Sequence, residues 1–313
     1  MKKSLFKLAL FSILPLLVIG YAVFLTGKKT DDFYKRFSSP QQNSLILGSS
    51  RAAGMNPAIL DSILNTKYPD VKLYNYAFTW AHSPYGPKYL ESVKKKIKPE
   101  TKSGFFIVTV EPTALMVDKN LPDSPENYNE NDKSVAMTST VSGNPNFEYL
   151  LENYNFSITH VLNRKILPEK NAIGTSEILD NGKIKVTRLK AVSLEKLNKE
   201  NKIRMAEFED RMINLKFSER RLSYLAETID FLKKHGTVVL VRMPINTAPY
   251  LIEKKYYPDF DSKISILSSQ KNVLYINYNN LKNDYLYGDE VHLTSESMDK
   301  FSQDLGEKLL LNH

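Results

Sequence analysis

The sequence predicts an α/β domain in which a parallel sheet lies between two layers of helices. An N-terminal membrane-spanning segment precedes this domain. Three observations lead to this prediction. Short apolar runs alternate with amphipathic runs of helical length over residues 44–110 and 237–310, and strands joined by helical crossovers pair in parallel. The run 105–110 (FFIVTV) consists of β-branched and aromatic residues, as in a strand covered on both faces. The third observation is an uncharged apolar segment, residues 8–27.

That apolar segment follows a short basic tail, residues 1–7. Its 20 residues would span roughly 30 Å as a helix, the thickness of a hydrocarbon core. A cleaved signal peptide is the alternative, with Gly20-Tyr21-Ala22 as a weak cleavage site; we favour a retained anchor because the segment is long. The basic tail favours a single-pass protein of the bacterial cell membrane with an exported body, although Lys28 and Lys29 follow the segment and weaken the charge rule.

The first part of the domain has a β-α-β-α-β rhythm. Residues 28–43 are polar and contain Pro40, which indicates a linker, so we expect the domain to run from residue 44 to 313. Asn56 and Pro57 are suited to the cap and first turn of a helix. The predicted elements are a strand at 44–48, a helix at 56–65, a strand at 72–77, a helix at 84–97 and a strand at 105–110.

Residues 111–215 interrupt this rhythm, and they predict an insertion or cap over the sheet's edge because they are too long for an ordinary connection. Asp180-Asn181-Gly182 is typical of a hairpin turn. The remaining elements expected here are a polar loop at 118–145, a helical piece at 147–163 and a charged helix at 193–215. Alternation then resumes with a helix at 219–235, a strand at 237–242, a helix at 262–269, a strand at 273–278 and a last helix at 295–310.

Composition narrows the function classes. The chain has 313 residues and a formal charge of +8, much of it from lysine, and the runs 94–96 and 233–234 are typical of solvated helix ends. No nucleic-acid-binding motif accompanies this charge, so we predict no nucleic-acid partner. The absence of cysteine excludes a lipoprotein anchor, a thiol nucleophile, disulfides and cysteine-ligated zinc. The histidines have no metal-ligand spacing, and we expect neither a metal nor another cofactor.

A serine and an Asp–His pair form the candidate catalytic site. Ser50 follows the first predicted strand, in SLILGSSRAAGMNP, at the sheet edge where parallel α/β folds bind ligands. Asp289 and His292 precede the last helix at a spacing that allows the carboxylate to orient the imidazole. A serine hydroxyl needs such an oriented base to act as a nucleophile. We therefore predict Ser50 as nucleophile, His292 as base and Asp289 as orienting group; the alternatives are a turn serine, a surface histidine and a capping aspartate.

Gly48-Ser49-Ser50 and Asp289-Glu290-Val291-His292 resemble the first and last motif blocks of the SGNH/GDSL hydrolase superfamily. The chain is most similar to membrane-anchored bacterial envelope members, such as teichoic-acid D-alanylation and polysaccharide O-acetylation proteins. The resemblance covers about 44–110 and 237–310. It implies a flavodoxin-like three-layer sandwich, and it assigns the same roles to Ser50, Asp289 and His292.

The resemblance also implies an activity: an esterase or O-acyltransferase that acts on acetyl- or alanyl-type esters of a cell-envelope polysaccharide or teichoic acid through an acyl-serine intermediate. The implied partners are the lipid bilayer, the acylated polymer and a membrane-bound O-acyltransferase. A non-catalytic assembly or binding component of an envelope polysaccharide pathway is the alternative.

The oxyanion site departs from the family pattern in two places. Where the second block offers a glycine N–H, this chain has Asn75-Tyr76-Ala77-Phe78, and the Asn75 amide or the Ala77 N–H is the candidate donor. Where the third block offers asparagine, it has Glu111, which cannot donate unless protonated. Arg51 and Arg242 are candidates for binding the oxyanion or substrate.

Four side chains near the predicted site have structural alternatives. Arg51 is equally suited to an ion pair with Glu111, and Arg242 to a buried ion pair. Trp80 and His82 follow the second strand and are expected to pack rather than to line the pocket.

Overall fold

The computed structural model describes residues 2–30, 33–152, 174–188, 193–281 and 284–312. Its centre is a parallel sheet of five strands in the order β2-β1-β3-β8-β9. The strands are β1 (Ser44–Leu47), β2 (Leu73–Asn75), β3 (Gly104–Thr109), β8 (Gly236–Arg242) and β9 (Leu274–Asn277). All five were expected from the sequence, and their ends differ from the prediction by at most two residues.

The strand order creates a switch point between β1 and β3. The chain moves outward from β1 to β2 and then returns to the other side of β1 to form β3, so the connections on the two sides of this gap run in opposite directions. In doubly wound sheets ligands bind outside the carboxyl ends of the strands at such a point. The residues that follow β1 therefore occupy the favoured position for a site.

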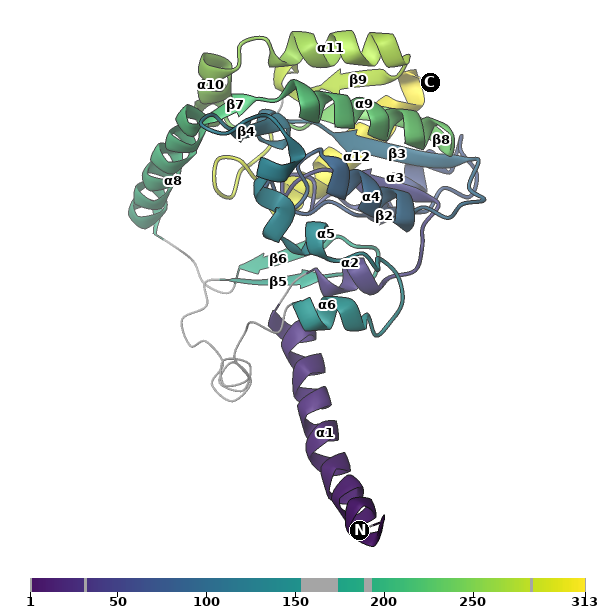
Figure 1. Ribbon diagram of the computed structural model, residues 1–313. Helices are drawn as coiled ribbons and strands as arrows, with labels where there is room; N and C mark the ends of the chain where they lie inside the picture. Colours follow the sequence, from purple (N-terminus) through teal and green to yellow (C-terminus); the bar gives the residue numbers. More distant parts are fainter. Residues whose placement is uncertain (1, 31–32, 153–173, 189–192, 282–283, 313) are drawn as a thin grey trace.

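Helices cover both faces of the sheet (Figure 1). Phe105 and Ile107 of β3 pack into one core cluster, while Phe106 and Val108 pack into the other, as the two-residue period of a strand requires. The first cluster includes α3 (Pro57–Leu64) and α12 (Ser295–Asn312); the second includes α4 (Pro87–Lys96), α9 (Glu219–Lys233) and α11 (Phe260–Lys271). The predicted arrangement of a sheet between two helical layers is confirmed.

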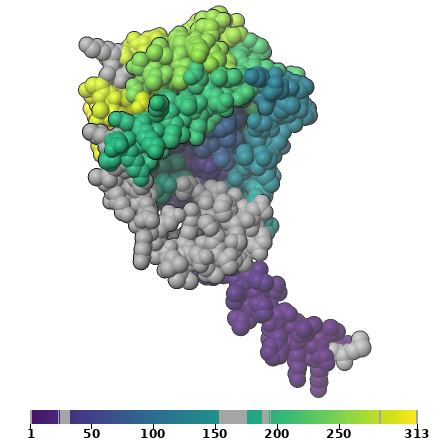
Figure 2. Space-filling model, turned by 90° about the vertical axis from the view of Figure 1, so that its left-hand side faces the viewer, coloured from purple at the N-terminus to yellow at the C-terminus, as the bar shows by residue number. Residues whose placement is uncertain are grey.

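An apolar helix, α1 (Lys2–Thr30), projects from the body in both views (Figures 1 and 2). Its portion Lys2–Ala22 has a mean hydropathy of 2.1 and is not buried by the rest of the chain. By length and composition it can cross a membrane, and a signal sequence would pass the same test. Pro15 lies within the helix.

The polar composition of residues 28–43 indicates a linker, but the structure contradicts this for the part after Phe33. A short helix, α2 (Tyr34–Ser38), packs onto the domain and buries Phe37 completely. Arg36 is also fully buried and donates to the carbonyl oxygens of Asn75 and Gly182. The aromatic residues of this stretch outweigh its polar ones because they fill the core beside β2.

One of the predicted solvated lysines is buried. Lys94 and Lys95 are exposed at the end of α4, as expected, but Lys96 is not exposed at all. Its Nζ lies 2.7 Å from the carbonyl oxygens of Arg36, Ser39 and Val141. Burial lowers the pKa of Lys96 to about 7. This side chain joins α2, α4 and the loop near residue 141.

The two ends of the segment between β3 and β8 lie side by side, because β4 (Met116–Asp118) pairs antiparallel with β7 (Leu215–Phe217). The hairpin of β5 (Gly174–Ile178) and β6 (Ile184–Arg188) turns at the predicted position, with Gly182 at a φ of +82°. The other elements are η1 (Pro112–Leu115), η2 (Pro125–Asn127), η3 (Asn129–Asp132), α5 (Ser134–Met137), α6 (Phe147–Glu152) and α8 (Leu194–Asn214). The predicted helical piece at 147–163 is observed as α6, and its residues from 153 onward lie outside the described part of the chain.

Two elements follow β8 and β9 that the sequence pattern does not predict. The helix α10 (Thr247–Tyr256) is capped by Asn246, whose side chain accepts from the Thr247 N–H at 2.8 Å. A short 3₁₀ turn, η5 (Tyr278–Asn280), follows β9. An asparagine cap with proline in the first turn is the local signal that could have identified α10.

Candidate active site

The turn after β1 places Ser50 at the carboxyl edge of the sheet. Gly48 has a φ of +143°, and a Cβ at this position would lie 1.8 Å from the Oγ1 of Thr109 on β3. Only glycine avoids both the strained backbone and this overlap. The Gly48 carbonyl accepts hydrogen bonds from the Phe78 N–H and the Ser83 hydroxyl, which hold the turn in place.

Ser50, His292 and Asp289 meet at this edge, although 242 residues separate the serine from the histidine. The Oγ of Ser50 lies 2.9 Å from the Nε2 of His292. The Nδ1 of His292 lies 2.9 Å from both carboxylate oxygens of Asp289, and the backbone N–H of His292 donates to the same carboxylate. A carboxylate beside Nδ1 favours the tautomer with its proton there, which leaves Nε2 to accept the serine proton.

The carboxylate of Asp289 is held in its charged form. Burial opposes ionisation, but hydrogen bonds from His292 and the charge of Arg204 outweigh it, so the pKa of Asp289 lies below its ordinary value. Arg204 belongs to α8 and its Nη1 lies 3.5 Å from the Asp289 carboxylate. The neighbouring Glu290 accepts from Asn201 of the same helix at 2.9 Å. The segment between β3 and β8 therefore supports the loop that carries Asp289 and His292.

The two candidate donors of the second block are engaged within the protein. The Asn75 amide nitrogen lies 2.8 Å, 3.3 Å and 3.1 Å from the carbonyl oxygens of Ala52, Ala53 and Met55, respectively. Its amide oxygen accepts the Ala77 N–H at 3.1 Å. Both groups that the sequence predicted as oxyanion donors are thus hydrogen-bonded within the protein, and their role as donors stays a prediction. The Asn75 side chain instead holds the loop that follows Ser50.

Arg51 and Arg242 belong to a buried ion-pair network. Arg51 lies 3.1 Å from Glu111 and 2.7 Å from Glu253, and Arg242 lies 2.8 Å from the other oxygen of Glu253. Arg242 also contacts Asp261. Both arginines thus form the buried ion pairs that the sequence offered as the structural alternative, and their role in binding an oxyanion or substrate stays a prediction. The sequence did not point to Glu253 because it lies on α10, which was not predicted.

Glu111 is not an isolated negative charge at the sheet edge. One of its carboxylate oxygens binds Arg51, and the other accepts the Thr113 hydroxyl at 2.9 Å. Burial of a carboxylate without a partner would be costly, whereas a matched cation and a hydrogen bond compensate for it. The negative charge that would oppose an oxyanion is therefore balanced within this network.

A cavity of about 610 Å³ lies beside Ser50 and His292. The wall contains Ser50, Asp289 and His292 with their chain neighbours, and four distant parts of the chain complete it. Its apolar lining comes from Phe33, Phe78, Ile184, Val186, Leu293 and Met298, and its charged lining from Lys183, Arg204 and Glu296, besides Asp289. The sequence did not identify these residues as site residues because their proximity depends on how the segment between β3 and β8 folds back.

Trp80 and His82 pack outside this cavity, as the structural alternative predicts. The guanidinium of Arg211 lies 4.3 Å from the centre of the Trp80 ring. The His82 ring packs edge to face against Phe33, and its Nδ1 lies 2.6 Å from the hydroxyl of Thr79. Burial, with a smaller contribution from Lys133, lowers the pKa of His82 to about 4.

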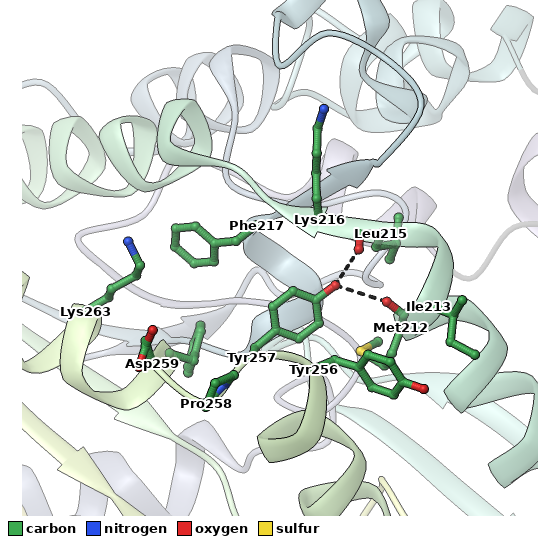
Figure 3. A pocket seen from close by; sticks show the side chains of 11 residues that line it. Met212, Ile213, Leu215, Lys216, Phe217, Tyr256, Tyr257, Pro258, Asp259 and Lys263 are labelled. Atoms are coloured by element: carbon green, nitrogen blue, oxygen red, sulfur yellow. Dashed lines mark hydrogen bonds between the residues drawn. The ribbon is translucent and has the colours of Figure 1, made fainter.

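A second hollow, drawn in Figure 3, has a volume of about 390 Å³ and contains no residue of the Ser50 site. The Tyr257 hydroxyl lies across it and is within hydrogen-bonding distance of the carbonyl oxygens of Met212 at 3.1 Å and Leu215 at 2.6 Å (Figure 3). Tyr257 thereby connects the end of α8 and the start of β7 to the turn between α10 and α11. The residues around this hollow therefore hold neighbouring elements together.

Comparison with known proteins identifies no family for the chain. No family model matches the sequence, and no curated protein matches it. Several solved structures are similar, and one of them aligns over 86% of this chain and 97% of its own, at 10% identity and a TM-score of 0.36. A likeness at that score carries no argument about fold or function. Within the described residues, no group of three or more His, Asp or Glu side chains is arranged to hold a metal ion.

Proposed function

We propose that this protein is a membrane-anchored serine esterase or acyltransferase of the SGNH/GDSL type, which acts on acyl esters of a cell-envelope polysaccharide or teichoic acid. The observation that carries the proposal is the contact between Ser50 and His292, with Asp289 behind the imidazole. This geometry arises from residues at opposite ends of the chain, and a turn serine or a surface histidine would not require it. The position of Ser50 at the switch point of a parallel sheet also supports the proposal.

The reaction has two steps. The Oγ of Ser50 attacks the ester carbonyl while the Nε2 of His292 takes the hydroxyl proton, and Asp289 stabilises the imidazolium that forms. The bond between the carbonyl carbon and the departing oxygen breaks, and His292 gives its proton to the departing alkoxide. In the second step His292 removes a proton from water or an acceptor hydroxyl, whose oxygen attacks acyl-Ser50, and the proton returns to the serine.

The number of hydrogen-bond donors available to the oxyanion affects whether acyl-Ser50 reacts with water or with an acceptor hydroxyl. The backbone N–H of Ser50 is the donor nearest to the nucleophile, while Asn75 and Ala77 are engaged elsewhere. Loss of one oxyanion donor costs about 10² to 10³ in rate. We therefore expect slow hydrolysis and favour transfer to an acceptor that is bound in place.

The proposed setting is the bacterial envelope. The helix α1 would anchor the protein in the lipid bilayer as a single pass, with the body exported. The segment 111–215 acts as a cap, since it contributes Ile184, Val186 and Arg204 to the cavity beside Ser50. The proposed partners are an acylated polysaccharide or teichoic-acid-like polymer and a membrane-bound O-acyltransferase.

A second candidate is a non-catalytic assembly or binding component of the same kind of pathway. The engaged Asn75 amide and the carboxylate of Glu111 favour it, because an efficient oxyanion site needs donors at these places. Complementation of a deletion strain by Ser50→Ala would support this candidate and exclude the enzymatic one.

Labelling by a fluorophosphonate probe tests the enzymatic proposal. The full chain in detergent should be labelled at Ser50, and Ser50→Ala should abolish the label because the attacking oxygen is gone. His292→Ala should slow labelling by at least 10² because the base is lost. Ser62→Ala is the matched control, since Ser62 is exposed on α3. Equal labelling of Ser50→Ala and the unchanged protein would overturn the assignment.

A further inference from the structure

The cavity beside Ser50 is apolar where it is most deeply buried. Phe78 is fully buried, and Leu293 and Met298 are less than a tenth exposed. The exposed lining residues are Arg204, Glu296 and Val186. A polysaccharide would need polar partners for its hydroxyl groups, and the deep part of the cavity offers an apolar surface instead. Its inner wall is mostly apolar and suits a hydrocarbon. Of its charged residues, Arg204 and Glu296 lie toward solvent, whereas Lys183 is buried and paired with Asp299.

The cavity is also much larger than an acetyl or alanyl group requires. Its volume of about 610 Å³ corresponds to roughly twenty water molecules at about 30 Å³ each. A chain of about six to ten carbon atoms, each comparable in volume to a water molecule, would fill roughly a third to a half of it. The remaining space would hold the alcohol side of the ester at the mouth.

The chain also places the cavity close to the bilayer if α1 is the anchor. Phe33 lines the cavity and is only three residues beyond Thr30, the last residue of α1. Three residues span at most about 11 Å even when fully extended. In Figure 1, α2, α6 and the β5–β6 hairpin lie on the side of the body from which α1 leaves.

Exposed apolar side chains on this side of the body fit contact with lipid. Phe147 and Leu151, one turn apart on α6, are 70% and 67% exposed. Val186 of β6 is 54% exposed and also lines the cavity. Single exposed apolar residues are common, but these three belong to elements on the side from which α1 leaves. A bilayer surface there would cover them.

We propose that the acyl group is an aliphatic chain of about six to ten carbons, taken from an ester that resides in the bilayer, and that the cavity binds this chain. The inference rests on the catalytic Ser50 of the proposed function, and it replaces the polymer ester by a lipid ester as the source of the acyl group. Ser50 attacks the lipid ester, its Oγ–acyl bond forms as the bond to the lipid oxygen breaks, and His292 protonates the departing lipid alkoxide. The acylated serine then transfers the chain to water or an acceptor hydroxyl.

A chain-length series tests the acyl site. The full chain in detergent is assayed with p-nitrophenyl acetate, butyrate, octanoate and palmitate, and kcat/KM is compared. Each buried methylene group contributes up to about fourfold, so octanoate should exceed acetate by at least tenfold, whereas palmitate should fall below octanoate because its chain exceeds the cavity. A flat profile, in a protein that fluorophosphonate still labels at Ser50, would overturn this inference and leave the proposed function standing. No labelling at all would remove the proposed function itself.

A substitution that introduces a charge into the cavity wall provides an independent test. Val186→Glu should reduce the octanoate-to-acetate ratio by at least tenfold, because the chain would have to pass a carboxylate. Ile266→Glu is the matched control, since Ile266 is exposed on α11 and does not line the cavity. Equal ratios for the two variants would overturn the assignment of the cavity. Because Val186 is exposed, the substitution should not prevent folding.

Vesicles identify the source of the chain. The full chain is reconstituted into dioleoyl phosphatidylcholine vesicles that contain didecanoyl phosphatidylglycerol at low mole fraction, quenched with acid and analysed by intact mass spectrometry. A decanoyl adduct that is absent from Ser50→Ala is expected. Octanoate selectivity in detergent without any adduct from vesicles would overturn the bilayer source and favour a water-soluble medium-chain ester.

Discussion

Replacement of Asp289 by asparagine should remove most of the reactivity of Ser50 while leaving the site folded. The two carboxylate oxygens each lie 2.9 Å from the Nδ1 of His292, so the carboxylate selects the tautomer that carries its proton on Nδ1. An amide of the same shape can instead donate to Nδ1, which places the imidazole proton on Nε2, opposite the serine. A base in the wrong tautomer cannot accept the serine proton, and in another serine–histidine–aspartate site, on an unrelated fold, this substitution costs about 10⁴ in rate.

The expected loss can be bounded from the contacts. Asp289 also accepts the backbone N–H of His292 and lies 3.5 Å from Arg204, and asparagine retains an acceptor for the first contact but loses the charge of the second. That exposed ion pair contributes at most about 1 kcal/mol, or roughly fivefold, so a larger loss must come from the imidazole. We expect the second-order rate of fluorophosphonate labelling to fall by about 10³ to 10⁴.

Glu290→Gln provides the matched control. It makes the same carboxylate-to-amide change one residue along, and the Glu290 side chain contacts Asn201 and Asn246 rather than His292. Its labelling rate should remain within about fivefold of the unchanged protein, as expected for a residue outside the reacting groups. A labelling rate for Asp289→Asn within fivefold of the unchanged protein would refute the argument that Asp289 orients the base.

Two further predictions concern stability. Lys96→Met should lower the free energy of unfolding by about 3 kcal/mol, because the carbonyl oxygens of three residues lose a buried donor. Urea denaturation measures this free energy, and the control Lys95→Met, at an exposed position, should change it by less than about 0.5 kcal/mol. Equal effects of the two substitutions would contradict the buried role of Lys96. Burial lowers the pKa of His82 to about 4, below the value of about 6.5 in an unfolded chain. The unfolded chain therefore binds the extra proton between these values, so the contribution of His82 to stability is complete above about pH 6.5 and is lost, by up to about 3 kcal/mol, as the pH falls to about 4. His82→Gln should remove this part of the pH dependence, and a stability difference from the unchanged protein that does not vary over that range would be inconsistent with it.

The segment between β3 and β8 has consequences for both the site and its specificity. Arg204 of α8 lies beside the carboxylate of Asp289, while Ile184 and Val186 of β6 form part of the wall of the cavity beside Ser50. This one segment thus contributes a charge beside the Asp289–His292 pair and part of the apolar surface that would select the acyl group.

The elements of the sheet were predictable because their signals are local. The β-branched and aromatic run FFIVTV and the Asn56-Pro57 helix start depend on a few neighbouring residues, and β3 and α3 appear where these patterns place them. The linker prediction failed at α2 because the aromatic residues there are buried by partners far along the chain. Lys96 was assigned to solvent for the same reason, since its acceptors lie on α2 and near residue 141.

The sequence by itself determined the parallel class of the sheet, the apolar N-terminal helix and the choice of Ser50, Asp289 and His292 as candidates. These features depend on strand and helix periodicity and on short motifs, which adjacent residues encode. Only the tertiary structure decided that Asn75 and Ala77 are engaged with each other and with the loop after Ser50, that Arg51 and Arg242 share Glu253, and that an apolar cavity adjoins the serine. The availability of a donor or a charge depends on which partners reach it in space, and in this chain those partners come from elements that are distant in sequence.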